Sequence, residues 1–284
     1  MSGEDRKRVP DIWIQSAAGT MTDTIAVKAP YRQEILLVDG VEVAMKRSGE
    51  GPVLLFLHGA SGVLAWSPFF EKLSQKYDVW VPDHPGFGAT PDQNWIRTIG
   101  DLAFFTLDLM QTAGLKDVTM VGHSLGGWLA AEIGIRDCSR IRNITFVAPA
   151  GLRIKGLAIG DNFVWNPEEL IHNLYFSPNV AQAVLDAMKA PELRDAIVRN
   201  QRAAAKFGWE PRWYNPQLEH WLHRIQVPTR IVWGEADRLF PVALADKWKE
   251  LLPQTEVLRL NTGHVPQAEM PDDVVRAIFG LAGE

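Results

Sequence analysis

The stretch VTMVGHSLGGWLAAEIGIR, residues 118–136, decides the fold. An apolar, β-branched run ends at Gly122 and a helix-forming apolar run begins at Leu125, so the stretch predicts a strand, a sharp turn and a helix. Ser124 stands on the turn, inside the pattern G-x-S-x-G. Glycine on either side of it tolerates strained backbone and close neighbours. A glycine-rich turn with an ordinary helix-capping serine is the alternative, and the flanking strand and helix favour a nucleophile.

Strand and helix patterns alternate on both sides of this turn. A hairpin through Asp39-Gly40 opens the series, and continuous apolar runs that suit strands buried on both faces follow it. The expected strands cover residues 34–38, 41–46, 53–57, 78–81, 118–121, 143–147, 229–233 and 256–260, and the clearest helices cover residues 69–75, 99–113 and 125–135. This alternation predicts an α/β fold with a largely parallel sheet and helices on both of its faces.

The alternation stops after about residue 150. Over residues 151–220 the sequence predicts helical pieces interrupted by prolines and no convincing strand, which indicates a helical lid on a core made of residues 31–150 and 221–284. Residues 1–30 lack clear periodicity. We expect an N-terminal arm there, either loosely ordered or packed on a partner subunit, and in the second case a homodimer.

Composition narrows the class of protein. Of 284 residues, 46% are apolar and 22% charged, the net charge is −5, and no run of Lys or Arg stands out. These values predict a globular protein that takes a small, neutral or apolar molecule and does not bind nucleic acid. The one cysteine, Cys138, suits a reducing cytoplasm. We find no signal peptide and no run of about 18 apolar residues, so we expect a soluble, cytoplasmic protein without a membrane partner.

A serine hydroxyl needs a base to attack, and the base needs an acceptor to orient it. His264 follows the last expected strand, at the edge of the sheet where Ser124 would stand, and loops at that edge build sites in open α/β sheets. Asp237 follows the preceding strand. We prefer it to Glu235 because it lies deeper in its loop. The chain order Ser124, Asp237, His264 is the one this architecture uses.

The developing negative charge on a substrate needs hydrogen-bond donors. The amide of Leu125, at a helix N-terminus, is one candidate, and LHGASG at residues 57–62 offers another at Ala60, with Ser61 in reserve. A plain β-turn is the alternative interpretation of this second segment. Two such amides would contribute several kcal/mol, since removing one donor from a protease costs about 2.7–4 kcal/mol.

The remaining histidines predict no metal site. His220 and His223 are spaced for one face of a helix, with Glu219 beside them, but no third ligand is evident. A solvated helix face is the better interpretation of this group.

Together these motifs resemble the α/β-hydrolase superfamily, in particular its cap-bearing serine hydrolases, over about residues 31–278. The resemblance is carried by His58-Gly59, Asp83 through Gly88, the turn at Ser124, Gly234 through Pro241, and Gly263 through Pro266 with Glu269 and Pro271. It implies an eight-stranded sheet, a helical cap inserted between strands six and seven, and no cofactor.

Ser124 also narrows the activity that the resemblance implies. Dehalogenases and epoxide hydrolases of this superfamily carry aspartate at the nucleophile, whereas esterases, lactonases, haloperoxidase-like enzymes and carbon–carbon bond hydrolases carry serine. The last group often has asparagine before the serine and a more glycine-rich oxyanion loop, from which His123 and Ala60-Ser61 depart. We therefore expect hydrolysis of a small ester or lactone through an acyl-enzyme.

Two alternatives stay open, namely a carbon–carbon bond hydrolase acting on a vinylogous diketone and a ligand receptor that keeps the triad with little turnover. Aromatic residues of the expected lid favour an apolar or aromatic substrate, although most of them suit ordinary packing. They are Phe163, Trp165, Tyr175, Phe176, Trp209, Trp213 and Trp221. Since an imidazole must be neutral to act as a base, activity should rise through roughly pH 6–7.5.

Overall fold

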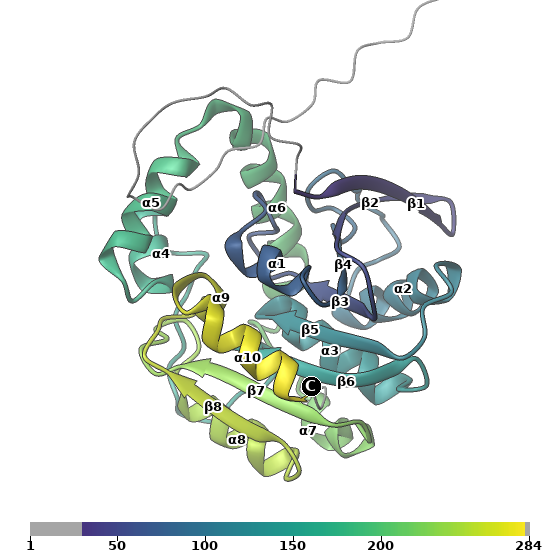
Figure 1. Cartoon of the computed structure of the whole chain (residues 1–284). Coiled ribbons are helices and arrows are strands. Elements are labelled where there is room, and N and C mark those ends of the chain that lie inside the picture. The colour runs from purple at the N-terminus through teal and green to yellow at the C-terminus, as the bar shows by residue number, and fades with distance from the viewer. Residues whose placement is uncertain (1–29, 282–284) are drawn as a thin grey trace, which may run out of the picture.

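A twisted eight-stranded sheet in the order β1-β2-β4-β3-β5-β6-β7-β8 forms the centre of the molecule in the computed structural model (Figure 1). The structure describes residues 30–281, so the arm expected over residues 1–30 lies almost wholly outside the described residues. The strands are β1 (Arg32–Val38), β2 (Val41–Ser48), β3 (Val53–Leu57), β4 (Asp78–Pro82), β5 (Val118–His123), β6 (Ile141–Val147), β7 (Thr229–Gly234) and β8 (Glu256–Leu260).

The direction of the strands decides where a site can form. β2 runs antiparallel to its neighbours β1 and β4, and every pairing from β4 across to β8 is parallel. Asp39 and Gly40, at the turn between β1 and β2, both have positive φ (45° and 78°), as a tight hairpin turn requires. The carboxyl ends of β3, β5, β7 and β8 therefore open on one edge of the sheet, as the sequence predicts.

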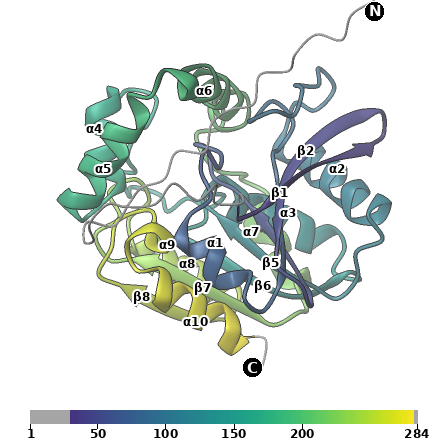
Figure 2. The same ribbon diagram turned by 45° about the horizontal axis from the view of Figure 1, so that its top comes forward.

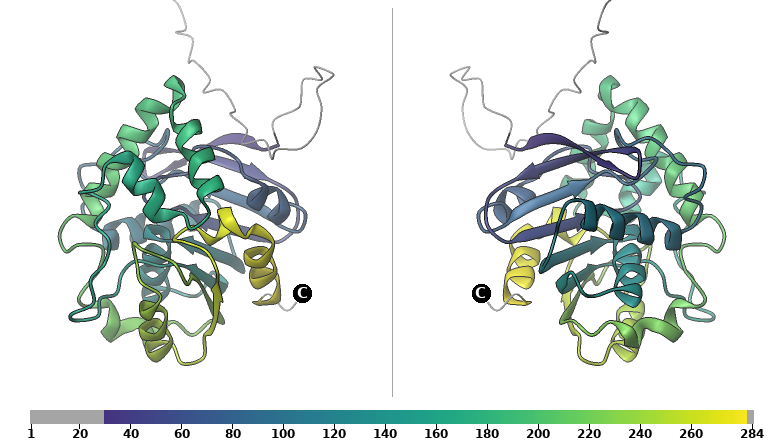
Figure 3. Two further views of the ribbon diagram at one scale, coloured as in Figure 1. Left: turned by 90° about the vertical axis from the view of Figure 1, so that its left-hand side faces the viewer. Right: turned by 90° about the vertical axis from the view of Figure 1, so that its right-hand side faces the viewer.

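Helices cover both faces of the sheet (Figure 3). One layer packs α2, α3 and α8 in a single hydrophobic cluster, and the opposite layer packs α1 and α10 in a second. The helices of the core are α1 (Pro68–Leu73), α2 (Ile99–Thr112), α3 (Leu125–Arg136), α8 (Ala243–Leu251), α9 (Pro266–Glu269) and α10 (Pro271–Leu281). The predicted class, an α/β fold with an eight-stranded, mostly parallel sheet between helical layers, is confirmed.

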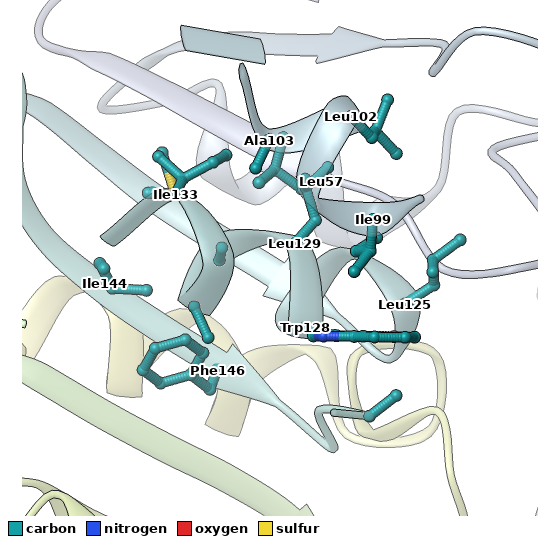
Figure 4. Packing of buried hydrophobic residues seen from close by; sticks show 14 of the residues in the cluster. Leu57, Ile99, Leu102, Ala103, Leu125, Trp128, Leu129, Ile133, Ile144 and Phe146 are labelled. Carbon is teal, nitrogen blue, oxygen red and sulfur yellow. The ribbon is translucent and has the colours of Figure 1, made fainter. Parts of the chain in front are cut away.

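The helix that follows Ser124 lies at the centre of the larger cluster. Leu125 and Leu129 are fully buried on α3, against Leu57 of β3 and residues of α2 (Figure 4). Because this helix is apolar around most of its circumference, it packs between the sheet and α2 rather than on the surface. The position of the Ser124 turn is therefore fixed by a buried helix of the core.

Between β6 and β7 the chain leaves the sheet and forms a group of helices. They are α4 (Pro167–Leu174), α5 (Pro178–Met188), α6 (Arg194–Gly208) and α7 (Leu218–Trp221), with short 3₁₀ turns at Pro191–Leu193 and Leu222–Arg224. Figures 1 and 2 show α4 beside α5, away from the layers that flank the sheet. α6 reaches the core, where Ala203, Ala204 and Phe207 join the larger hydrophobic cluster. Residues 148–228 contain no strand, and one isolated bridge joins Gly151 to Tyr214. We call residues 148–228 the insertion.

Within residues 30–281, no helix has both the length and the apolar character that crossing a bilayer requires.

Candidate active site

Ser124 sits at the tip of a strained turn between β5 and α3. Its backbone has φ 54° and ψ −114°, and its hydroxyl does not cap the helix that it precedes. The alternative of an ordinary capping serine is thereby removed. The Ser124 amide donates to the carbonyl of Val147, and its carbonyl accepts from the amides of Gly127, Trp128 and Ala150. These main-chain bonds help to hold Ser124 in a backbone conformation that non-glycine residues rarely adopt.

Glycine is required beside the serine for steric reasons. A Cβ on Gly126 would lie 1.9 Å from the carbonyl oxygen of Leu57, and one on Gly122 would lie 2.3 Å from that of Gly126. Both obstacles are backbone atoms, which no rotation of a side chain removes. Local packing thus accounts for the G-x-S-x-G pattern.

His264 and Asp237 meet Ser124 in a continuous hydrogen-bonded chain. His264 Nε2 lies 2.9 Å from Ser124 Oγ, and its Nδ1 lies 2.8 Å from Asp237 Oδ2. Ser124 is 5% exposed, His264 2% and Asp237 6%. A ring nitrogen that faces a carboxylate carries the hydrogen, so Nδ1 donates to Asp237 and Nε2 is left free to accept the seryl proton. The structure brings together the three residues that the sequence selects.

Asp237 is fixed by its own loop. Its Oδ1 accepts from the amides of Leu239 (2.9 Å) and Phe240 (2.8 Å), which leaves Oδ2 for His264. Glu235, the competing carboxylate, is exposed. The two amides thus orient the carboxylate toward His264.

The loop of Ala60 leaves β3 directly beside Ser124. A Cβ on Gly59 would lie 3.3 Å from Ser124 Cβ, which places this loop against the nucleophile. The Gly59 carbonyl accepts from Gly62 N (3.0 Å) and is 2.8 Å from His58 Nδ1. Because the carbonyl and the N–H of a trans peptide point in opposite directions, holding the Gly59 carbonyl also sets the direction of the Ala60 N–H. The segment is thus a β-turn, the alternative that the sequence left open, and the bonds to the Gly59 carbonyl fix the orientation of the Ala60 amide.

Buried histidines surround this loop. His58 Nε2 accepts from the amide of His84 at 3.1 Å, and the two rings lie 4.0 Å apart. Burial lowers the pKa of His58 and, more strongly, that of His84, where nearby His58 adds to the effect. His58 faces a carbonyl with Nδ1 and an N–H with Nε2, so only its neutral form, with the hydrogen on Nδ1, fits both partners.

His123 touches both loops that face Ser124. Its Nε2 lies 3.0 Å from the carbonyl of His264, and a Cβ on Gly59 would meet its Nδ1 at 2.9 Å. Burial, followed by repulsion from a charged His264, lowers the pKa of His123 to about 3. It is therefore a neutral donor to the His264 backbone at ordinary pH.

Residues 54–277 match the model of the alpha/beta hydrolase family. The chain belongs to this family. Three curated relatives are each 26% identical to this alpha/beta hydrolase, but their names differ in chemistry.

One of the three is the dihydrolipoyllysine-residue acetyltransferase component of the acetoin cleaving system of Cupriavidus necator, with 83% of this chain and 65% of that protein covered. The present chain therefore spans less than two thirds of that relative. The 2-hydroxy-6-oxo-6-(2'-aminophenyl)hexa-2,4-dienoic acid hydrolase of Metapseudomonas resinovorans aligns over 89% of this chain and 92% of its own length. The pimeloyl-[acyl-carrier protein] methyl ester esterase of Nitrosomonas europaea aligns over 84% and 99%.

In this alpha/beta hydrolase the insertion contacts the loop of His264. The His264 amide donates to the carbonyl of Leu174, at the end of α4, over 2.7 Å. Glu269 accepts from Gly263 N (2.7 Å) with one carboxylate oxygen and from Ser177 N (2.6 Å) with the other. Sequence reasoning gave Glu269 no role beyond its place in a motif, and nothing in the sequence pairs Leu174 with His264. The contacts are carried mostly by main-chain atoms, which leave no residue-type signal.

Three aromatic residues of the insertion, Phe163, Trp209 and Trp213, pack on one another. Phe163 stacks on Trp213 with ring centroids 5.3 Å apart, Trp209 meets Phe163 edge-on, and the Arg212 guanidinium lies 4.5 Å from the Trp209 ring centroid. These residues therefore have a structural explanation that does not require a substrate. Within residues 30–281 no three His, Cys, Asp or Glu residues lie close enough to hold a metal, and both His220 and His223 are exposed.

Proposed function

We propose that this alpha/beta hydrolase is a serine hydrolase that cleaves a small, apolar or aromatic carboxylic ester or lactone through an acyl-enzyme on Ser124. The observation that carries the proposal is the unbroken chain Asp237–His264–Ser124, with bonds of 2.8 and 2.9 Å, ending on a hydroxyl that caps no helix. A serine held in this way has a base to remove its proton and no competing structural task.

The steps follow from the geometry. His264 Nε2 takes the proton as Ser124 Oγ bonds to the carbonyl carbon, and Asp237 stabilises the imidazolium that forms. The substrate oxygen becomes negative and accepts hydrogen bonds from the amides of Leu125 and Ala60. His264 then gives its proton to the leaving alcohol, and the carbon–oxygen bond breaks. Water, deprotonated by His264, repeats the attack on the acyl-enzyme and restores Ser124.

Burial strengthens these electrostatic effects. All three side chains are more than nine-tenths buried, so the amides act on the oxyanion with little competition from water. We propose that residues 151–220 act as the lid that selects the substrate, since the end of α4 bonds to the His264 loop.

The single cysteine supports a cytoplasmic location.

A carbon–carbon bond hydrolase is the second candidate, because the relative from Metapseudomonas resinovorans is named for such a dienoic acid. The first candidate is preferred because His123 stands before the nucleophile, where carbon–carbon bond hydrolases often have asparagine, and because Ala60-Ser61 departs from their more glycine-rich oxyanion loop. An equally similar relative is named a methyl ester esterase.

The test is steady-state turnover of a panel made of p-nitrophenyl esters, lactones and vinylogous diketones, by the wild type and by Ser124→Ala. We expect multiple turnovers of esters or lactones and a loss of at least about 10⁴-fold in kcat for the variant. Turnover of the diketones alone would select the second candidate. Binding without turnover, unchanged by the substitution, would select a receptor.

A further inference from the structure

Asn200 is a buried amide on α6 that reaches out of the insertion to two loops of the core. It is 2% exposed. Its Nδ2 donates to the carbonyl of Ser61 at 2.7 Å, and its Oδ1 accepts from the amide of Gly88 at 2.9 Å. Ser61 belongs to the turn that carries Ala60, and Gly88 ends the DHPGFG motif. One side chain thus joins α6, the Ala60 turn and the neighbouring loop.

Both partners define how the amide of Asn200 is oriented. The NH₂ group faces a carbonyl and the oxygen faces an N–H, so the reversed orientation would place like groups against each other. The fit is also close, because a Cβ on Gly62 would lie 2.5 Å from Asn200 Nδ2. The Ala60 turn therefore packs directly against the Asn200 side chain.

The contact is transmitted to Ala60 through two rigid peptide groups. The Ser61 carbonyl that Asn200 holds belongs to the same peptide as the Gly62 N–H, which donates to the Gly59 carbonyl at 3.0 Å. The Gly59 carbonyl in turn belongs to the same peptide as the Ala60 N–H. Since each peptide is planar, fixing the first fixes the second through that hydrogen bond.

We propose that Asn200 is a positioning residue that couples the insertion to the oxyanion site by aiming the Ala60 amide at the substrate. This inference rests on the proposed function of Ser124. The transition state gains from an aimed amide more than the bound ester does, so Asn200 acts on kcat and leaves KM largely unchanged.

Arg199 supplies a matched control on the same helix. It is exposed, and it donates to the carbonyl of Gly88 at 2.7 Å without touching Ser61. Arg199→Ala removes a bond between α6 and the core, whereas Asn200→Ala removes the bond to the Ala60 turn. Asn200→Asp is a second variant of the same size, which keeps an acceptor for Gly88 and turns an oxygen toward the Ser61 carbonyl.

The experiment measures two rates for the full chain: ester turnover, and phosphonylation of Ser124 by a fluorophosphonate followed by mass spectrometry. We expect Asn200→Ala and Asn200→Asp to lower kcat roughly tenfold to hundredfold with KM within about twofold. Phosphonylation should slow by a similar factor, because the phosphoryl oxygen uses the same amides. Arg199→Ala should leave both rates within about twofold of the wild type.

Phosphonylation separates this proposal from the proposed function. If the wild type turns over no ester but is phosphonylated at Ser124, the proposed function fails while the ratio of phosphonylation rates still tests Asn200. Equal rates for Asn200→Ala and Arg199→Ala, or a change confined to KM, would overturn the inference. Thermal unfolding measures whether the two Asn200 variants fold. Loss of the folded state in both would also overturn the inference, because Asn200 would then stabilise the whole fold and not only the Ala60 turn.

Discussion

Ser124 lies in a turn that its own neighbours hold, whereas the loops of His264 and Ala60 are held from the insertion. Main-chain bonds to Val147 of β6 and to Gly127 and Trp128 of α3 fix Ser124, and a fourth comes from Ala150, three residues after the end of β6. The His264 amide instead bonds to Leu174 of α4, and the Ala60 turn bonds to Asn200 of α6. The nucleophile is thus built into the core. Its two partners depend on the insertion, through Leu174, which precedes His264 by 90 residues, and through Asn200, which follows Ser61 by 139 residues. Substitutions at the core turn should affect folding, and those at the insertion contacts should affect rate.

Gly126→Ala should have the largest effect, and on folding. The new Cβ would overlap the carbonyl oxygens of Leu57 and His58, at 1.9 and 2.7 Å. We expect the free energy of unfolding to fall by at least about 4 kcal/mol, the range of exceptional single substitutions. Urea unfolding followed by circular dichroism measures it.

Gly114→Ala is the control for this variant. Gly114 has a positive φ of +66°, which side chains rarely adopt, but a Cβ there would meet no atom within 4 Å. Strain alone should cost about 1–2 kcal/mol. Similar losses in the two variants would mean that the turn at Ser124 is not held by packing.

Glu269→Ala should act on rate instead. The substitution removes the acceptor shared by Gly263 N and Ser177 N, so the loop of His264 loses its side-chain link to the insertion. We expect kcat to fall about tenfold, less than the 10²-fold that a 1 Å displacement can cost, because the bond from His264 N to Leu174 remains. The kcat of Glu269→Gln, which keeps one acceptor oxygen, should lie between that of the wild type and that of Glu269→Ala. Wild-type kcat in Glu269→Ala would show that the insertion does not position the histidine.

His123→Asn should have the smallest effect, on the pH dependence of stability. The pKa of His123 in the folded state is about 3, below the ordinary 6.5. Between these two pH values the unfolded chain therefore binds a proton at His123 that the folded chain does not bind. The stability that neutral His123 contributes is complete above about pH 6.5 and falls as the pH drops toward 3. Replacing it should reduce the loss of unfolding free energy between pH 7 and pH 5 by about 1–2 kcal/mol.

The matched control is His220→Asn, at an exposed position of α7. Thermal or urea unfolding at the two pH values should show no such reduction for it. If His123→Asn and His220→Asn change the pH dependence equally, His123 is not held neutral by its surroundings.

The same comparison explains what the sequence could predict. The strands, the Ser124 turn and the order of Ser124, Asp237 and His264 follow from periodicity, glycine positions and loop order, all of which are local signals. The predicted strands of residues 53–57 and 256–260 coincide with β3 and β8, and the other six expected strands differ from the observed ones by at most two residues at either end. Local propensity and parallel pairing agree over this part of the chain, so a single sequence suffices.

The contacts of the insertion could not be predicted in this way. Asn200 lies mid-helix, where asparagine ordinarily signals nothing, and its partners are 139 and 112 residues away. Leu174 acts through its carbonyl, which every residue has. Such pairings depend on how the insertion packs on the core. The residues that meet there follow no periodic pattern, so a single sequence does not reveal which of them are in contact.

The most direct measurement is the mass of the protein after a short reaction with a p-nitrophenyl ester and an acid quench, for the wild type and Ser124→Ala. We predict that the wild type gains the mass of one acyl group, located by peptide mapping on Ser124, and that the variant gains none. Turnover with the label on another residue, or undiminished turnover by Ser124→Ala, would contradict the claim that Asp237, His264 and Ser124 form one catalytic relay.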